Sequence, residues 1–100
     1  MGAVRTEKKT PACPKWLDAE AKREWRRLAR RINLAEEHTA IFAGYCQAYA
    51  RWREAEEYIT EHGMTDESGR TLTQVAVAQT YLGIMKEFAG QLGLVPASGG

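Results

Sequence analysis

The densest chemistry in this sequence is a group of arginines between residues 16 and 32. Its members are Arg23, Arg26, Arg27, Arg30 and Arg31, with Lys22 beside them and few acids in the second half of the segment. A guanidinium group forms two parallel hydrogen bonds with a phosphate, whereas a lysine ammonium acts as a point charge. The residue types and their density therefore indicate a surface that binds a polyanion through its phosphates.

The charge of the chain is strongly polarised. The first 33 residues hold ten Lys and Arg and four acids, or +6, and the other 67 hold four Lys and Arg and nine acids, or −5. The net charge of +1 conceals this division. A basic end on an acidic body indicates two functions, polyanion binding at one end and protein contacts over the rest.

One amphipathic helix is expected to present the arginines. It begins after Asp18, a residue suited to the N-cap, and runs to about Ile32, with Asn33 suited to its end. Its apolar stripe is Ala21, Trp25, Leu28 and Ile32; at about 100° per residue, Arg23, Arg27 and Arg30 lie opposite, flanked by Arg26 and Arg31. A merely solvated face is the competing interpretation, since Glu20–Arg23 and Glu24–Arg27 have the spacing of ordinary surface ion pairs. No set of side chains here predicts the reading of base edges.

The sequence predicts no catalysis, cofactor or metal site. His38 and His62 are expected near opposite ends of one long helix, His38 as a packed or rim side chain and His62 as a helix C-terminal residue. Cys13 and Cys46 lie far apart without ligand spacing, which indicates one thiol in the tail and one in the core of a protein in a reducing cytosol. Trp25 and Trp52 are expected to anchor the core, and Trp16 to pack back on the first turn of the basic helix.

Two further helices are predicted. The first runs from about residue 35 to His62, closed by Gly63, and the second from Thr73 to Leu92. The polar connection between them is either a short hairpin with its turn at residues 66–69 or a plain loop. The last helix is apolar on two faces, so it needs two partners. One stripe is expected to meet the preceding helix, and the other to form an oligomer interface with a second copy; the interface stripe is Val77, Tyr81, Ile84 and Phe88.

These elements predict an all-α fold, in which a basic N-terminal helix is followed by a long antiparallel helical hairpin that assembles into a homo-oligomeric ring. Residues 1–14 are expected to be a flexible basic arm, residues 15–93 a single helical domain and residues 94–100 an irregular tail. No apolar run approaches the roughly 20 residues that span a bilayer, so no membrane contact is expected.

Several segments, in order, resemble phage terminase small subunits. They are Pro14-Lys15-Trp16-Leu17, the stretch 20–28, the stretch 45–52 with Ala55-Glu56 and Gly63, and the closing stretch 92–98. The likeness covers roughly residues 11–98. It implies a non-catalytic DNA-packaging protein that forms rings, recognises viral double-stranded DNA and hands it to the large terminase subunit, the ATPase and nuclease. It also implies the cytoplasm of the bacterial host as location.

On this basis the predicted function is viral DNA binding together with recruitment or regulation of the large subunit. The predicted DNA-binding residues are Lys8, Lys9, Lys15, Lys22, Arg23, Arg26, Arg27, Arg30 and Arg31. Two alternatives stay open. The same arginines would serve a helical adaptor that grips an acidic protein, and the layout of the first two helices would suit a small dimeric helix-turn-helix regulator.

Overall fold

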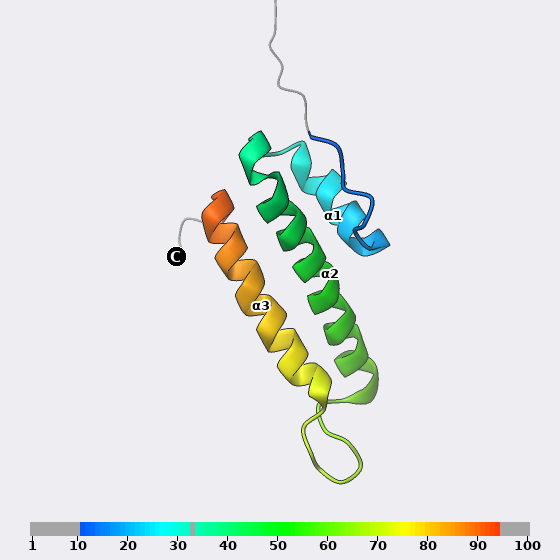
Figure 1. Ribbon diagram of the computed structural model, residues 1–100. Helices are drawn as coiled ribbons and strands as arrows, with labels where there is room; N and C mark the ends of the chain where they lie inside the picture. Colours follow the sequence, from blue (N-terminus) through cyan, green and yellow to red (C-terminus); the bar gives the residue numbers. More distant parts are fainter. Residues whose placement is uncertain (1–10, 33, 95–100) are drawn as a thin grey trace, which may run out of the picture.

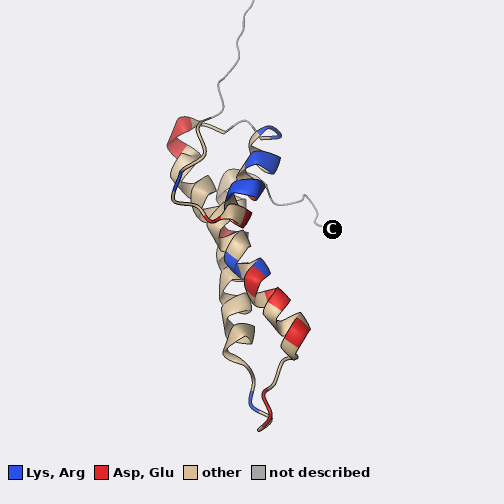
Figure 2. Ribbon diagram, turned by 90° about the vertical axis from the view of Figure 1, so that its right-hand side faces the viewer, with Lys and Arg blue, Asp and Glu red and all other residues tan. Residues whose placement is uncertain are grey.

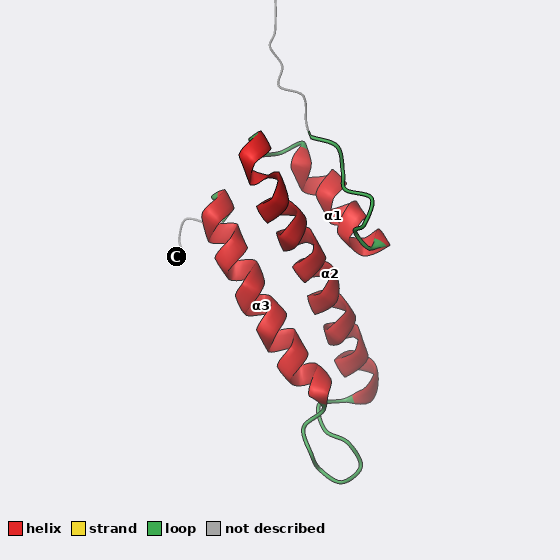
Figure 3. Cartoon of the chain, viewed as in Figure 1, coloured by secondary structure: helices red, strands yellow, loops and turns green. Residues whose placement is uncertain are grey.

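Three α-helices make up most of the computed structural model, which describes residues 11–32 and 34–94. They are α1 (Ala19–Ala29), α2 (Thr39–His62) and α3 (Thr73–Leu92), and a 3₁₀ turn at Glu36–His38 leads into α2 (Figures 1 and 3). The described residues form no strand, apart from one isolated bridge between Thr65 and Thr71. The all-α class is confirmed for this part of the chain.

The helices lie side by side in a single layer with α2 in the middle (Figure 1). α2 and α3 form the predicted antiparallel hairpin, and α1 packs on the opposite side of α2, near its N-terminal half. α1 and α3 hardly touch each other. Because the layer is one helix thick, both of its broad faces are open to solvent or to other molecules. None of the described helices is long and apolar enough to cross a membrane.

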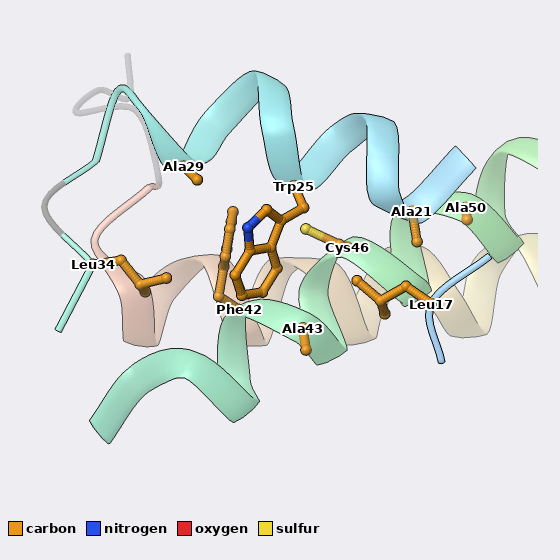
Figure 4. Packing of buried hydrophobic residues seen from close by; sticks show 9 residues of the cluster. All are labelled: Leu17, Ala21, Trp25, Ala29, Leu34, Phe42, Ala43, Cys46 and Ala50. Carbon is orange, nitrogen blue, oxygen red and sulfur yellow. The ribbon is translucent and has the colours of Figure 1, made fainter. Parts of the chain in front are cut away.

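The buried core lies at the end of the layer that carries α1. Leu17, Ala21 and Trp25 meet Phe42 and Cys46 there, together with Ala29, Leu34, Ala43 and Ala50 (Figure 4). The Trp25 indole packs in a tilted arrangement against the Phe42 ring, with the ring centroids 4.7 Å apart. Full burial of such a side chain contributes about 1.5–3 kcal/mol. Trp25 is thus the core anchor that the sequence predicted.

The two thiols are free, and Cys46 is buried in this core while Cys13 packs half-buried against it. Burial raises the pKa of the Cys46 thiol to about 12, because the apolar surroundings disfavour the thiolate. The prediction of a core thiol at Cys46 is confirmed.

Helix bounds agree with the sequence at α3, at the start of α1 after Asp18 and at the end of α2 at His62; they differ at the end of α1 and the start of α2. α3 spans Thr73–Leu92 as predicted and ends on Gly93, whose φ of 75° is left-handed, while Leu94 N donates to the Ala89 carbonyl at 2.8 Å. α1 ends at Ala29, before the predicted Ile32, because the chain turns back to bury Leu34 in the core. Near residue 35, where the sequence predicted the start of the long helix, the chain forms the 3₁₀ turn Glu36–His38 instead, and α2 begins at Thr39. Asn33, predicted to end α1, lies outside the described residues.

The connection between α2 and α3 is the hairpin-like loop that the sequence left as one of two options. Besides the Thr65–Thr71 bridge, Leu72 N donates to the Met64 carbonyl at 2.8 Å. The Asp66 carboxylate accepts hydrogen bonds from Ser68 N, Ser68 Oγ and Arg70 N at 2.7–2.9 Å. These bonds lower the pKa of Asp66 and tie the turn together without a hydrophobic core.

Two tryptophans are less buried than predicted, and His38 does not take the packed one of its two predicted placements. Trp16 is 67% exposed, and its neighbour Leu17 enters the core instead. Trp52 is only half-buried, and His38 is exposed. The reason is the single layer: a stripe residue on α2 is covered only where α1 or α3 lies over it, and no element covers the broad faces.

The seam between α2 and α3 is lined by small residues. Ala48, Ala55 and Ala78 are buried there, and Phe88 lies on Gly44, where an added Cβ would come within 2.9 Å of the ring. The close approach brings both apolar stripes of α3 to α2, rather than one stripe alone. The stripe Val77, Tyr81, Ile84 and Phe88 is therefore already half-buried within one chain, and its contact with a neighbouring copy stays a prediction.

Candidate nucleic-acid interface

The basic residues gather at the α1 end of the molecule, and the acids of α2 lie toward the other end (Figure 2). Of the predicted DNA-binding residues, six are exposed and Lys22 is half-buried; the exposed ones are Lys15, Arg23, Arg26, Arg27, Arg30 and Arg31. Lys8 and Lys9 lie outside the described residues. The exposed cations do not, however, form one equivalent set, because their partners differ.

Arg23 is held by a neighbour on its own helix. Its Nη1 donates to Glu20 Oε1 at 2.8 Å, and Arg53 of α2 approaches the same carboxylate at 3.6 Å. The Glu20 side chain is 31% and that of Arg23 70% exposed. An ion pair this accessible contributes little to the free energy of unfolding, so Arg23 can exchange Glu20 for another anion with little loss of stability.

Arg27 is held far more firmly, because its partner is buried. Glu24 is only 3% exposed and accepts two hydrogen bonds from Arg27, from Nε at 3.0 Å and from Nη2 at 2.7 Å. These bonds and the charge of Glu24 raise the pKa of Arg27. Burial, and then the same carboxylate, raise the pKa of Tyr45 on α2.

The sequence offered Glu24–Arg27 as an ordinary surface pair in the competing interpretation of this face; the pair forms, but Glu24 is buried rather than on the surface. The available signal was position: Glu24 adjoins Trp25 and lies on the flank of the apolar stripe, where α2 covers it. A buried carboxylate needs its cation, so Arg27 is committed to the fold rather than free to bind phosphate.

The remaining arginines form what we call the free arginine set: Arg26, Arg30 and Arg31. All three are exposed, and none forms an ion pair with another described residue. Arg26 lies in the last turn of α1, while Arg30 and Arg31 lie on the turn that follows, where Arg31 N donates to the Leu28 carbonyl at 2.8 Å. The predicted arginine face thus divides into paired and available guanidinium groups.

Gln47 is a positioning residue that sequence reasoning missed. Its Nε2 donates to Asp18 Oδ2 at 2.8 Å, and its Oε1 accepts from Asp18 N at 3.1 Å. Asp18 occupies the N-cap position of α1, as predicted, but its carboxylate makes no capping bond within α1. The reciprocal pair instead fastens the start of α1 to α2. No sequence pattern links residues 29 positions apart, so only the fold could show it.

Comparison with known proteins decides the family. The family model described as phage terminase, small subunit, matches residues 21–99. The chain belongs to the phage terminase small subunit family. No curated protein matches the chain, and no solved structure matches it either. The resemblance stated from the sequence is confirmed, and membership indicates a role in phage DNA packaging with partners in the packaging machinery.

Terminase small subunits are generally non-catalytic. Among residues 11–32 and 34–94, no three His, Cys, Asp or Glu side chains come together as a metal-binding group.

His62 stacks on Tyr58 with ring centroids 3.9 Å apart and contacts the Tyr58 carbonyl through Nδ1 at 3.0 Å. It therefore has the predicted place at the C-terminus of its helix.

The position of α2 bears on the helix-turn-helix alternative. A recognition helix must enter the major groove with one face free. In this member of the family, α2 is flanked by α1 on one side and α3 on the other, and Phe42, Ala43 and Cys46 are buried. Packing thus occupies two sides of the N-terminal half of α2 while its broad faces stay open, so the helix-turn-helix layout stays an alternative prediction.

Proposed function

We propose that this chain binds viral double-stranded DNA through the free arginine set and recruits or regulates the large terminase subunit in the bacterial host cytoplasm. The observation that carries the proposal is the exposure of Arg26, Arg30 and Arg31 at one end of α1, without an ion partner among the described residues, in a member of a packaging family. Lys15 and Lys22 add positive charge nearby, and Arg23 joins when DNA displaces Glu20.

Contacts of this kind supply affinity without reading a base sequence. Each guanidinium–phosphate contact releases counterions, so binding weakens steeply with salt. Three arginines per copy bind weakly alone. In a homo-oligomeric ring the set is repeated around the assembly, and the repeats raise the overall affinity through effective concentration. We propose Val77, Tyr81, Ile84 and Phe88 as part of the surface that joins the copies.

The DNA proposal is tested by removing two of the free arginines. We expect Arg30→Ala with Arg31→Ala to weaken binding to duplex DNA and to reduce the slope of log affinity against log salt by about 2, since each phosphate contact contributes about 0.9. Fluorescence anisotropy of labelled duplex DNA between low and physiological salt measures both quantities.

Arg70→Ala with Lys86→Ala is the matched control, because it removes the same charge from exposed positions away from α1. This variant should keep the wild-type slope. Equal slopes in the two double variants would show that α1 is not the DNA surface and would favour the acidic-protein adaptor. Sedimentation of the chain with the large subunit of the same phage, with and without DNA, tests recruitment separately.

A further inference from the structure

Trp16 is the most exposed large apolar side chain in the part of the chain that the structure describes, with 67% of its surface open to solvent. The turn that carries it is fixed on both sides of the core. Leu17, the next residue, is 4% exposed and points into the core (Figure 4). Asp18 is bonded to Gln47 of α2 through its backbone N at 3.1 Å and its Oδ2 at 2.8 Å. The fold therefore holds the Trp16 indole out in solvent.

An indole presented on a fixed turn is suited to binding, because little conformational freedom is lost when a partner covers it. Tryptophan is also the residue type most often found at the energetic centre of a binding contact. Two kinds of surface fit an exposed indole: an apolar pocket of another protein, and the face of an unpaired nucleic-acid base. The charge around Trp16 distinguishes between them.

The surroundings of Trp16 are basic. Residues 11–32 hold seven Lys and Arg and three acids, a charge of +4, and the adjacent Lys15 is exposed. Positive charge with an exposed aromatic side chain is the combination by which proteins bind single-stranded nucleic acid: the cations bind the backbone and the bases stack on the ring. Nucleic acid with unpaired bases therefore fits both features of this surface.

One member of the free arginine set lies on the same broad face as this turn. Glu24 and Arg26 are two residues apart on α1, so at about 100° per residue they lie on opposite flanks of the helix. Tyr45 and Gln47 are likewise on opposite flanks of α2. Glu24 is beside Tyr45, whose pKa it helps to raise, whereas the turn that carries Trp16 is fastened to Gln47. Arg26 therefore lies on the flank of the turn.

We propose that Trp16 stacks on an unpaired base of DNA while Lys15 and Arg26 bind neighbouring phosphates. Stacking on an indole tolerates any base sequence, because every base has a π-face. In an intact duplex the base faces are covered by their neighbours, so the site favours DNA that has a single-stranded stretch. The inference rests on the DNA binding proposed above and adds a preference that phosphate contacts alone do not supply.

Two probes with the same duplex sequence test this preference, one blunt and one with a single-stranded tail of about ten thymidines. The wild type should bind the tailed probe more tightly. Trp16→Ala should weaken binding to the tailed probe at least about fivefold, the effect of one stacked base, and leave binding to the blunt probe unchanged. Stacking releases no counterion, so the slope of log affinity against log salt should stay that of the wild type. Fluorescence anisotropy measures these quantities.

Two further variants make the test specific. Trp16→Tyr keeps an aromatic face and should retain most of the affinity for the tailed probe. Tyr58→Ala is the matched control, because it removes a 38% exposed aromatic side chain from the acidic half of α2. This variant should bind both probes as the wild type does. Far-UV circular dichroism checks that each variant keeps its helices.

Indole emission reports stacking directly. Oligothymidylate should quench part of the emission of the wild type, and Trp16→Ala should lose that part. The other two indoles give the remaining emission, since Trp25 is buried and Trp52 is half-buried.

The outcomes separate this inference from the wider proposal. Equal affinity of the wild type and Trp16→Ala for the tailed probe would overturn the stacking site and favour a protein partner for the indole. A wild type that binds the blunt duplex and gains nothing from the tail would also overturn this inference alone. A wild type that binds neither probe would overturn the proposed DNA binding and this inference with it.

Discussion

At the scale of single residues, Glu24 decides which arginines are available for function. It is the one charged residue of the described chain that is buried, and it accepts hydrogen bonds from Nε and Nη2 of Arg27. In the sequence alone, the five arginines between residues 23 and 31 look equivalent. In the fold, Arg27 neutralises a buried carboxylate and Arg23 pairs with an accessible one, while the other three have no ion partner among the described residues.

The Glu24–Arg27 pair leads to a stability prediction. Arg27→Ala should lower the free energy of unfolding by about 1–3 kcal/mol, because it leaves a buried carboxylate without its donor. Arg23→Ala, whose partner Glu20 is accessible, should change it by less than about 0.5 kcal/mol. Urea unfolding at one fixed protein concentration measures both values.

Replacement of the carboxylate provides a second check on the same pair. Adding Glu24→Gln to Arg27→Ala should recover part of the lost stability, since an unpaired buried amide costs less than an unpaired buried charge. Equal effects of Arg27→Ala and Arg23→Ala would contradict the structural role that the burial of Glu24 indicates.

The buried Cys46 thiol makes stability depend on alkaline pH. Its pKa is raised from 9.0 to about 12 by burial, so the unfolded chain loses this proton at lower pH than the folded chain does. Ionisation of the unfolded form draws the equilibrium toward unfolding, and the contribution is lost as the pH rises from 9 toward 12. Urea midpoints of the wild type should therefore fall more steeply over this range than those of Cys46→Ala. Parallel pH profiles would refute the assignment.

At the scale of elements, small residues determine how closely α2 and α3 approach. Gly44, Ala48, Ala55 and Ala78 line the seam, so large side chains are displaced to its two sides. The sequence placed α3 correctly because its apolar stripes and Gly93 mark both its length and its end. It did not show that both stripes reach α2, since stripe spacing carries no information on the distance between helices.

Gly44 tests the seam directly. Gly44→Ala should destabilise the protein by about 1–3 kcal/mol, because the new methyl group would lie 2.9 Å from Phe88 Cε2 and force the ring aside. Adding Phe88→Leu should relieve part of this cost. The measurement is again urea unfolding at constant protein concentration.

Gly83 is the matched control for this substitution, since it lies in α3 with nothing within 4 Å of an added Cβ. Gly83→Ala should stabilise the protein by about 0.5–1 kcal/mol through helix propensity alone. If Gly44→Ala also stabilised the protein, the close packing of Phe88 on Gly44 would be wrong.

At the scale of the whole molecule, the single helical layer separates a basic end from an acidic end. The α1 end holds the buried core and the free arginine set, whereas the acids in the C-terminal half of α2 lie toward the far end of the hairpin (Figure 2). Acidic surface at that end disfavours DNA there. The polarity of charge along the sequence thus becomes a polarity of charge along the molecule.

Local chemistry in the sequence by itself determined the helical class, the ends of α3, the Trp25 anchor, the core thiol and the concentration of charge at one end. These follow from periodicity, caps and composition, which act over a few residues. Only the tertiary structure decided that Glu24 is buried, that Gln47 fastens Asp18, and that Trp16 is exposed and Trp52 only half-buried. Each of these depends on which element lies opposite a given face, and the spacing within one helix cannot specify that.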